Sequence, residues 1–316
     1  MSRRRPSRWN GLLPVFKKTG PTSHDVVDVA RCSLRERRIG HTGTLDPMAE
    51  GLLLLCVGKA TRLQQYLLGW DKTYIGRVRL GWATDTYDAE GERIQPEGTP
   101  PVLSTEQLLE FKNRFSGEIE QVPPPYSAKK VGGKKLYELA RDGQSIDVEA
   151  KKVTVHALEL EQTSENEIRL EVTVSSGFYV RSLAHDLGTS LGCGGHLRAL
   201  ERTRIGVLDA NDALAQDALE AAKSPEEIID GPHWIPLERI PLPFPSVDLN
   251  PTAAQRFLHG QEVVVLRSSD EPLTAGSPIA VRRGNDLIGV GSVKNLLARG
   301  RTVNVQPTLV LGDAPE

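Results

Sequence analysis

The stretch "KKVTVHALELEQTSENEIRLEVTVSSGFYVRSLAHDLGTSLG", residues 151–192, decides the fold class. Its first part alternates hydrophobic and polar residues with a period of two, which predicts two neighbouring antiparallel strands. A helix should follow, because aliphatic side chains then recur at helical spacing: Val180, Leu183, Leu187 and Leu191. Two consecutive strands before a helix do not make a βαβ repeat. The segment therefore favours an α+β fold around a mixed, largely antiparallel sheet.

The flanking sequence extends this pattern in both directions. Thr22 and Ser23 are good N-cap residues, and the alternation from residue 72 places Tyr74 on one face of a strand with Gly76. Helices are expected at 23–37, 59–69 and 104–117, the last with Ser104 as its N-cap. Strands are expected at 52–57 and in the alternating stretch "KTYIGRVRLGWATDT", residues 72–86. Toward the C-terminus a helix ending at Gly260 and three more strands are expected.

The proline-rich segment "GPHWIPLERIPLPFPSVD", residues 231–248, has linker composition. We therefore expect a basic tail at 1–10, one large domain at 11–245 and a small β-rich domain at 246–316. An insertion at about 121–144 begins with consecutive prolines, which exclude regular structure at its start.

Composition restricts the class of protein. With 316 residues, 39% hydrophobic and 25% charged, the chain is typical of globular proteins, and no apolar run is long enough to cross a bilayer. The basic N-terminus has no apolar segment behind it and is not a secretory signal. Three widely spaced cysteines form no disulfide framework. A cytoplasmic location is therefore expected.

The net charge of −2 indicates no particular partner, so any nucleic-acid surface must be local. Three segments are basic: "SLRERRIG" (33–40), "SAKKVGGKKLYELAR" (127–141) and "HLRALERTRIG" (196–206). The second has tyrosines at 126 and 137 close by, a combination suited to contacting a phosphate backbone and stacking on bases. Ordinary solvated faces are the alternative.

The motif "GHTGTLDPMAEG", residues 40–51, is the strongest local candidate for a site. Pro47 directs Asp46 toward an extended conformation, while Gly40 and Gly43 permit a tight turn and close approach of a ligand. A carboxylate in that place can act as a nucleophile, although an Asp-Pro pair is also a common turn device. By pattern alone, Tyr74 is a core residue and Arg181 a surface residue.

Other chemistries find little support in the sequence. There is no Walker A sequence, no G-x-G-x-x-G after a strand and no G-x-S-x-G. Cys193 and His196 have a ligand-like spacing, but no second pair matches them, so no metal site is expected.

Taken together and in order, the motifs resemble the TruB-type tRNA pseudouridine synthases. The resemblance covers about residues 10–240, and its most specific part is "GHTGTLDPMAEGLLLLCVGKATR" at 40–62. The other matching segments are "GPTSHDVV", "KTY", "RLGWATDTYDAEG", "QVPPPYSAKKVGGKKLYELAR", "GFYVRSLAHDLG" and "LGCGGHLRALERTRIG". The resemblance implies an isomerase that converts uridine 55 in the T-loop of tRNA to pseudouridine. Base flipping is required, and no cofactor is needed.

The resemblance also implies catalytic roles. Asp46 corresponds to the essential aspartate, which attacks the ribose, attacks the uracil ring or removes the 2′ proton. Arg181 corresponds to the arginine that pairs with this aspartate. Tyr74 corresponds to the tyrosine that stacks on the target base and is a candidate for the final proton transfer from C5.

Further positions correspond to residues that contact the RNA. His41 resembles the histidine that fills the gap left by the flipped bases, and Tyr179 and Leu200 resemble residues around the flipped uracil. The basic insertion with Lys129 and Lys130 resembles the loop that grips the T-arm. The C-terminal domain occupies the place of a PUA-type RNA-binding domain in that family.

One motif departs from the family pattern. The family opening Lys-Pro-x-Gly-x-Thr-Ser is here "KKTGPTS", with Thr19 taken in place of the first proline, which leaves Lys18 without a clear family counterpart.

Two other functions remain open at this stage. One is a T-loop binding or folding protein with secondary catalysis, and the other is a guide-RNA-dependent synthase of the H/ACA type. The Asp46, Tyr74 and Arg181 set favours a stand-alone enzyme that acts as a monomer on tRNA, and the long basic insertion argues against the H/ACA type.

Overall fold

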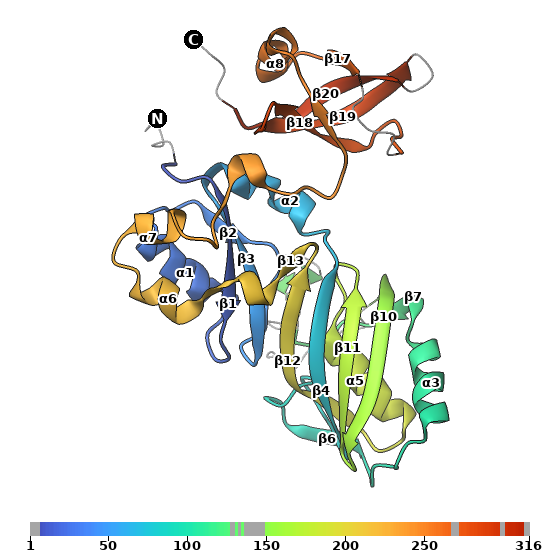
Figure 1. Cartoon of the computed structure of the whole chain (residues 1–316). Helices are drawn as coiled ribbons and strands as arrows, with labels where there is room; N and C mark the ends of the chain where they lie inside the picture. The colour runs from blue at the N-terminus through green and yellow to red at the C-terminus, as the bar shows by residue number, and fades with distance from the viewer. Residues whose placement is uncertain are drawn as a thin grey trace.

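The computed structural model describes residues 7–126, 130–131, 134–135, 149–266, 272–297 and 301–312, with no side-chain description at 130–131 and 134–135. Within these residues, one large sheet and one smaller sheet dominate the chain, and helices pack against the large sheet (Figure 1). The expected α+β class, with a largely antiparallel sheet and a small β-rich C-terminal part, is confirmed. None of the described helices is both long and apolar enough to cross a membrane.

The large sheet has eleven described strands, and its main path runs β14-β1-β3-β12-β4-β11-β10-β7. Its strands are β1 (Gly11–Lys17), β2 (Ile39–His41), β3 (Ala49–Val57), β4 (Lys72–Leu80), β7 (Gly117–Gln121), β10 (Lys151–Ser164), β11 (Glu167–Val174), β12 (Gly195–Ile205), β13 (Leu208–Asp209), β14 (Leu214–Ala215) and β15 (Ile235–Pro236). As expected, β10 and β11 pair antiparallel.

The sheet consists of two halves that meet at β3 and β12. These two strands run parallel and pair over only three residues, Leu200 with Ala49, Glu201 with Glu50 and Arg202 with Gly51. On one side of this seam lie β1, β2 and β14, and on the other lie β4, β11, β10 and β7. The short seam brings the residues just before β3 close to the middle of β12.

Helices cover the two halves separately (Figure 1). The described helices are α1 (Ser23–Ser33), α2 (Gln64–Leu67), α3 (Thr105–Arg114), α5 (Val180–Ser190), α6 (Gln216–Ala221), α7 (Pro225–Ile229) and α8 (Pro251–Leu258), with 3-10 turns η1 (Gly58–Leu63), η2 (Ala210–Asp212) and η3 (Leu237–Arg239). Helices α1, α6 and α7 contribute Val26, Leu219 and Ile228 to a core cluster with β1 and β3. Helix α5 contributes Leu183 and Leu187 to the cluster beneath β4 and β11.

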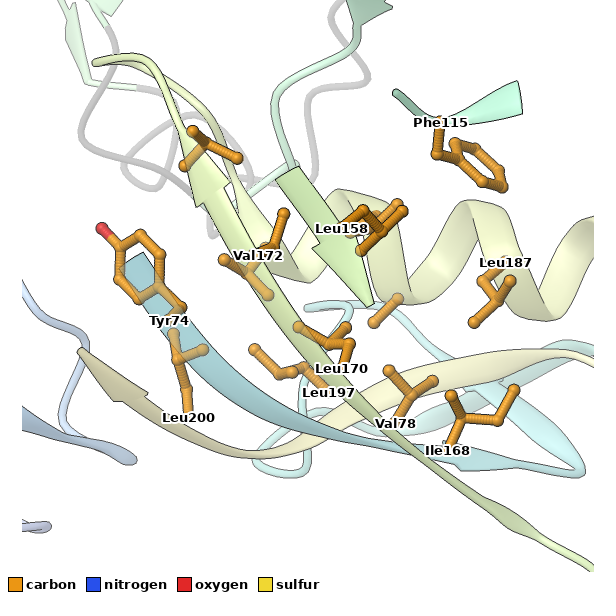
Figure 2. Close-up of a cluster of buried hydrophobic side chains, with 14 of the residues drawn as sticks. Tyr74, Val78, Phe115, Leu158, Ile168, Leu170, Val172, Leu187, Leu197 and Leu200 are labelled. Atoms are coloured by element: carbon orange, nitrogen blue, oxygen red, sulfur yellow. The ribbon is translucent and has the colours of Figure 1, made fainter. Parts of the chain in front are cut away.

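Figure 2 shows the second of these clusters, in which Tyr74 and Leu200 lie at one end. The predicted face of β4 is confirmed, since Tyr74, Gly76, Val78 and Leu80 are all buried. The hydroxyl oxygen of Tyr74 points away from the labelled aliphatic side chains (Figure 2). The core therefore ends in an aromatic ring whose polar group faces out of the cluster.

Two predicted helices are shorter than expected. The helix predicted at 23–37 ends at Ser33, because Arg35 adopts a left-handed backbone conformation with φ of 50°. The helix predicted at 59–69 is the 3-10 turn η1 followed by the single turn α2. Its first turn is tightened where the Thr61 hydroxyl donates to the Gly58 carbonyl at 2.7 Å. The predicted caps at Thr22 and Ser104 both form, each as a capping box.

The C-terminal sheet has the order β16-β18-β19-β20-β17. Its strands are β16 (Ser246–Asp248), β17 (Val263–Leu266), β18 (Pro278–Arg283), β19 (Asp286–Leu297) and β20 (Thr302–Val310). It has its own core with α8, and a second cluster joins Leu287 and Leu309 to Leu12 and Leu63 of the large domain. Two small ribbons complete the structure, β5 (Trp82–Thr84) with β6 (Arg93–Glu97) and β8 (Lys130–Val131) with β9 (Lys134–Lys135).

Candidate active site

Asp46 lies on a turn immediately before β3, at the seam between the two halves of the sheet. The N–H of Ala49 donates to the Asp46 carbonyl at 3.1 Å, so Pro47 occupies the second position of a β-turn, where its fixed φ is favoured. Ser23 holds the residue before Asp46, because its hydroxyl accepts from the Leu45 N–H at 2.8 Å and donates to the Leu45 carbonyl at 3.0 Å. The backbone around Asp46 is therefore fixed on both sides.

The glycines of this motif have different functions. Gly43 lines the pocket next to Asp46 and has φ of 148°, as the turn requires. Gly40 is not among the residues that line this pocket, and a Cβ there would lie 2.9 Å from the Gln64 side chain, so its role in ligand approach stays a prediction. Gly51 is required at the seam, because a Cβ there would lie 2.4 Å from the Arg202 carbonyl oxygen.

Arg181 is buried in the first turn of α5, with 8% of its side chain exposed, so the surface position expected from the pattern alone is wrong. Its Nε lies 3.0 Å from Asp46 Oδ2. Its Nη1 donates to Asp88 Oδ2 at 3.2 Å and to the Thr86 carbonyl at 3.1 Å, and its Nη2 donates to the Tyr126 carbonyl at 3.0 Å. Burial of a guanidinium is tolerated when its donors are used in this way.

Asp88 is the second carboxylate at Arg181, and sequence reasoning missed it. Its side chain is 5% exposed and is held by the Thr86 hydroxyl at 2.6 Å and the Glu90 N–H at 3.1 Å. The Thr84 hydroxyl donates to the Asp88 carbonyl at 2.7 Å. In the sequence this residue belongs to "DTYDAEGE", residues 85–92, which by composition alone is a turn.

A pocket of about 410 Å³ opens beside this ion pair. It brings together five residues predicted for the site, because Asp46, Tyr74, Tyr179, Arg181 and Leu200 all line it. These residues come from both sides of the seam. Asp46 is the only acidic side chain among the described lining residues.

Burial and charge act in opposite directions on the Asp46 carboxyl. Burial raises the pKa of Asp46 above its ordinary value, and the neighbouring Asp88 carboxylate raises it further. The Arg181 guanidinium and, less strongly, Lys17 lower this pKa. Arg181 is therefore the main group that favours the charged form of Asp46.

Lys17, rather than Lys18, is the lysine of this site. The spacing Lys-x-x-Gly in "KKTGPTS" begins at Lys17, so it is Lys18 that stands in place of the family proline. Lys17 is fully buried, and its Nζ donates to the Ala49 carbonyl at 2.6 Å, beneath the Asp46 turn. Burial lowers its pKa to about 8. Lys18 instead pairs with Asp217 at the surface.

Two further cationic side chains, Arg202 and Lys72, line the pocket. Arg202 belongs to a segment expected to be a basic patch, but it is 1% exposed and points inward. It donates to the Leu52 carbonyl at 2.7 Å and to the Gly43 carbonyl at 3.0 Å. Lys72 is also buried and lines the pocket, and burial, aided by Arg202, lowers its pKa to about 8. The sequence did not reveal that these two side chains are buried, because the burial of a charged residue depends on the tertiary fold.

The remaining predicted contact residues lie further out. His41 lies in β2, outside the pocket lining, where its Nδ1 accepts from the Gly43 N–H at 3.3 Å. Burial lowers the pKa of His41, and Arg202 lowers it further. Lys129 and the Lys130 side chain, together with most of the predicted insertion, lie outside the described residues.

Comparison with known proteins identifies the family. The family model "TruB family pseudouridylate synthase (N terminal domain)" matches residues 31–180, and "tRNA pseudouridylate synthase B C-terminal domain" matches residues 181–243. A tRNA pseudouridine synthase B of Azoarcus sp. (strain BH72) is 43% identical over 292 residues, which cover 92% of this chain and 94% of that protein. The chain belongs to the TruB family of pseudouridylate synthases.

Other relatives agree with this TruB membership. The tRNA pseudouridine synthase B of Aquifex aeolicus (strain VF5) is 38% identical over 288 residues, covering 90% of this chain and 96% of that protein. The expected class, a tRNA pseudouridine synthase and hence an isomerase, is confirmed. Asp46 and Tyr74 fall in the first matched region, and Arg181 and Leu200 fall in the second. The pocket at the seam therefore contains residues of both matched regions.

The TruB fold is also similar to more distant solved structures. A chain of an H/ACA ribonucleoprotein bound to a substrate RNA containing 2′-deoxyuridine superimposes with a TM-score of 0.73 at 23% identity, covering 96% of this chain and 86% of that one. A chain of a Cbf5-Nop10-Gar1 complex gives the same TM-score and identity. At this identity the likeness shows the fold alone.

Proposed function

We propose that this chain isomerises uridine 55 in the T-loop of tRNA to pseudouridine in the pocket beside Asp46. The observation that carries the proposed site is the 3.0 Å pair between Asp46 and Arg181 at the wall of a pocket of about 410 Å³. The base must leave the RNA stack to react, and a pocket of this size accommodates a flipped nucleotide.

The reaction rearranges one nucleotide without a net gain or loss of atoms. The bond between N1 and C1′ breaks, a bond between C5 and C1′ forms, C5 loses a proton and N1 gains one. Asp46 acts by attack at C1′, attack at C6 or removal of the 2′ proton, and each route uses the carboxylate anion. Arg181 supports that anion in a place where bound RNA excludes water.

The geometry around Arg181 supports a positioning role for Asp88. Three acceptors besides Asp46 hold the guanidinium: the Asp88 carboxylate and the carbonyls of Thr86 and Tyr126. Because these contacts fix the guanidinium plane, Nε is presented to Asp46 before the substrate arrives. Such preorganisation avoids rearrangement during the reaction.

Tyr74 and Leu200 form the apolar side of the pocket. Both are 9% exposed and both belong to the large core cluster, so their positions are set by packing (Figure 2). The Tyr74 ring stacks on the flipped uracil, and its hydroxyl takes part in removing the C5 proton. Tyr179 is held at the start of α5 by paired hydrogen bonds with the Gln121 amide at 2.7 and 3.0 Å and closes another wall.

The rest of the chain provides RNA contacts. We assign 11–245 as the catalytic domain, with the basic insertion at 121–144 gripping the T-arm, and 246–316 as a PUA-like RNA-binding domain. The separate core of the C-terminal sheet supports this boundary. His41, just outside the pocket, fills the gap that the flipped bases leave.

We place the reaction in the cytoplasm, with the enzyme acting as a monomer. The tRNA substrate is found there, and Cys32, Cys56 and Cys193 are free thiols, as a reducing compartment maintains them.

The test is incubation of the protein with an unmodified tRNA transcript, followed by mapping of pseudouridine along the RNA. Product at uridine 55 is expected for the wild type and for the surface control Asp217→Asn, and none for Asp46→Asn. No product from a wild type that binds the transcript tightly would favour a T-loop binding protein instead. Product from Asp46→Asn would exclude the assigned role of this aspartate.

A further inference from the structure

Tyr87 has an unusual backbone conformation close to the active site. Its φ is 64°, in the left-handed region that bulky residues rarely adopt. Such a conformation costs about 1–3 kcal/mol and persists only where the surrounding structure holds it. The residue lies in the turn between β5 and β6, directly between Thr86 and Asp88.

The side chain of Tyr87 stacks on His185. The two ring centroids are 3.8 Å apart and the planes are within 12° of parallel. His185 lies on α5 four positions after Arg181, which is about one helical turn along the same face. The stack therefore connects the turn to the helix beside the residue that carries the active-site guanidinium.

The same turn contacts Arg181 on both sides of Tyr87, through a backbone carbonyl before it and a side-chain carboxylate after it. The Thr86 carbonyl accepts from Arg181 Nη1 at 3.1 Å, and Asp88 Oδ2 accepts from it at 3.2 Å. The Tyr87 carbonyl accepts from the Leu197 N–H of β12 at 2.9 Å, which ties the turn to the sheet. A shift of Tyr87 would therefore move two of the acceptors that orient the guanidinium.

His185 takes part in this arrangement through the face of its ring. Its Nδ1 is buried and makes no hydrogen bond to any described residue. Burial lowers the pKa of His185. Burying a polar atom without a partner costs free energy, so the position of the ring is maintained by the stack rather than by a hydrogen bond.

We propose that Tyr87 and His185 are positioning residues of the synthase, which hold the Thr86 carbonyl and Asp88 against Arg181 and so orient Asp46. The inference rests on the proposed function of the Asp46 pocket. Neither ring is among the described residues that line the pocket, so the proposal assigns them no direct contact with the substrate base. The stack acts on the reaction through Arg181 alone.

The first test uses two variants of Tyr87. Tyr87→Asn removes the ring but tolerates the left-handed backbone, whereas Tyr87→Phe keeps the ring and removes the hydroxyl. Under single-turnover conditions, Tyr87→Asn should lower the rate of pseudouridine formation about tenfold or more and change the Kd for tRNA less than about threefold. Tyr87→Phe should remain within about twofold of the wild type in both.

The partner ring gives an independent pair of variants. His185→Ala should slow the reaction as Tyr87→Asn does, and His185→Phe should restore it, because phenylalanine can keep the stack. The double variant Tyr87→Asn, His185→Ala should be about as slow as the slower single variant, since both remove one interaction. A wild-type rate in Tyr87→Asn, an equal loss in Tyr87→Phe, or a loss confined to Kd would overturn the proposal.

A crystal structure of Tyr87→Asn separates this inference from the proposed function. If the stack positions Arg181, the contact between Arg181 Nε and Asp46 Oδ2, 3.0 Å in the wild type, should lengthen or break. An unchanged contact overturns the positioning role even if the variant is slow. A wild type that forms no pseudouridine contradicts the proposed function, and the geometry of the variant still tests the stack.

Discussion

Replacing Arg181 with methionine removes a cation that two carboxylates share. Asp46 lies 3.0 Å and Asp88 3.2 Å from this guanidinium, and their side chains are 35% and 5% exposed. Methionine is unbranched and fills much of the same space without a hydrogen-bond donor. The variant therefore leaves Asp88 buried and unpaired, with Asp46 close to it.

The magnitude follows from this burial. Removing one partner of a buried ion pair costs about 3–5 kcal/mol, and the lower end applies here because solvent in the pocket screens Asp46. A loss of about 3 kcal/mol at pH 8 corresponds to a fall in Tm of about 6 °C for a protein of this size. Turnover should fall about 10²- to 10³-fold, because a preorganised charge beside the reacting carboxylate is lost.

The loss of stability should depend on pH. Burial already raises the pKa of Asp46, and without Arg181 the main group that lowers it is gone. Above the ordinary aspartate pKa, the folded variant then binds a proton that the unfolded chain releases, so its stability falls as pH rises through the folded-state pKa. The deficit relative to wild type should be small at pH 5 and largest at pH 8.

Thermal unfolding at both pH values and release of tritium from a transcript labelled at uridine C5 measure the two effects. The double variant Arg181→Met, Asp88→Asn is the control, and it should recover much of the stability but none of the turnover. An Arg181→Met variant as stable as wild type at pH 8, or with equal deficits at both pH values, refutes the shared-cation account. Retained turnover refutes the role of Arg181 in the reaction.

Three further predictions follow from other parts of the site. Gly51→Ala should lower the free energy of unfolding, measured by urea denaturation, by about 3 kcal/mol, because the new Cβ would lie 2.4 Å from a backbone atom. Gly117 also has a positive φ, but a Cβ there would meet nothing within 4 Å, so the control Gly117→Ala should cost only about 1 kcal/mol. The pKa of Lys17 is about 8 in the folded protein, below its value in the unfolded chain, so the wild type gains stability as pH rises from 8 to 10. Lys17→Met should therefore show a smaller rise in Tm over this interval. Identical profiles of Tm against pH for the two proteins would contradict this. Tyr74→Phe should keep the Kd for tRNA within about threefold while lowering the single-turnover rate at least about tenfold, and an unchanged rate would exclude its hydroxyl from proton transfer.

The parts of the fold that could be predicted from the sequence are those governed by local patterns. The caps at Thr22 and Ser104 formed as expected, and so did the inward face of β4. Strand β1 was missed because it is almost entirely buried and shows no alternation, and β12 was missed because an irregularity near Arg198 interrupts its pairing with β4.

By itself, the sequence determined the fold class, the position of the catalytic motif and, through the ordered motifs, the family. Only the tertiary structure decided which charges surround Asp46. Asp88, Arg181 and Lys17 are far apart in the chain and act on Asp46, whose turn lies next to the seam between β3 and β12. The periodicity of hydrophobic residues indicates which side chains of a single helix or strand are buried. The pKa and orientation of Asp46 depend instead on charges brought within a few ångströms by strands whose pairing no local pattern encodes.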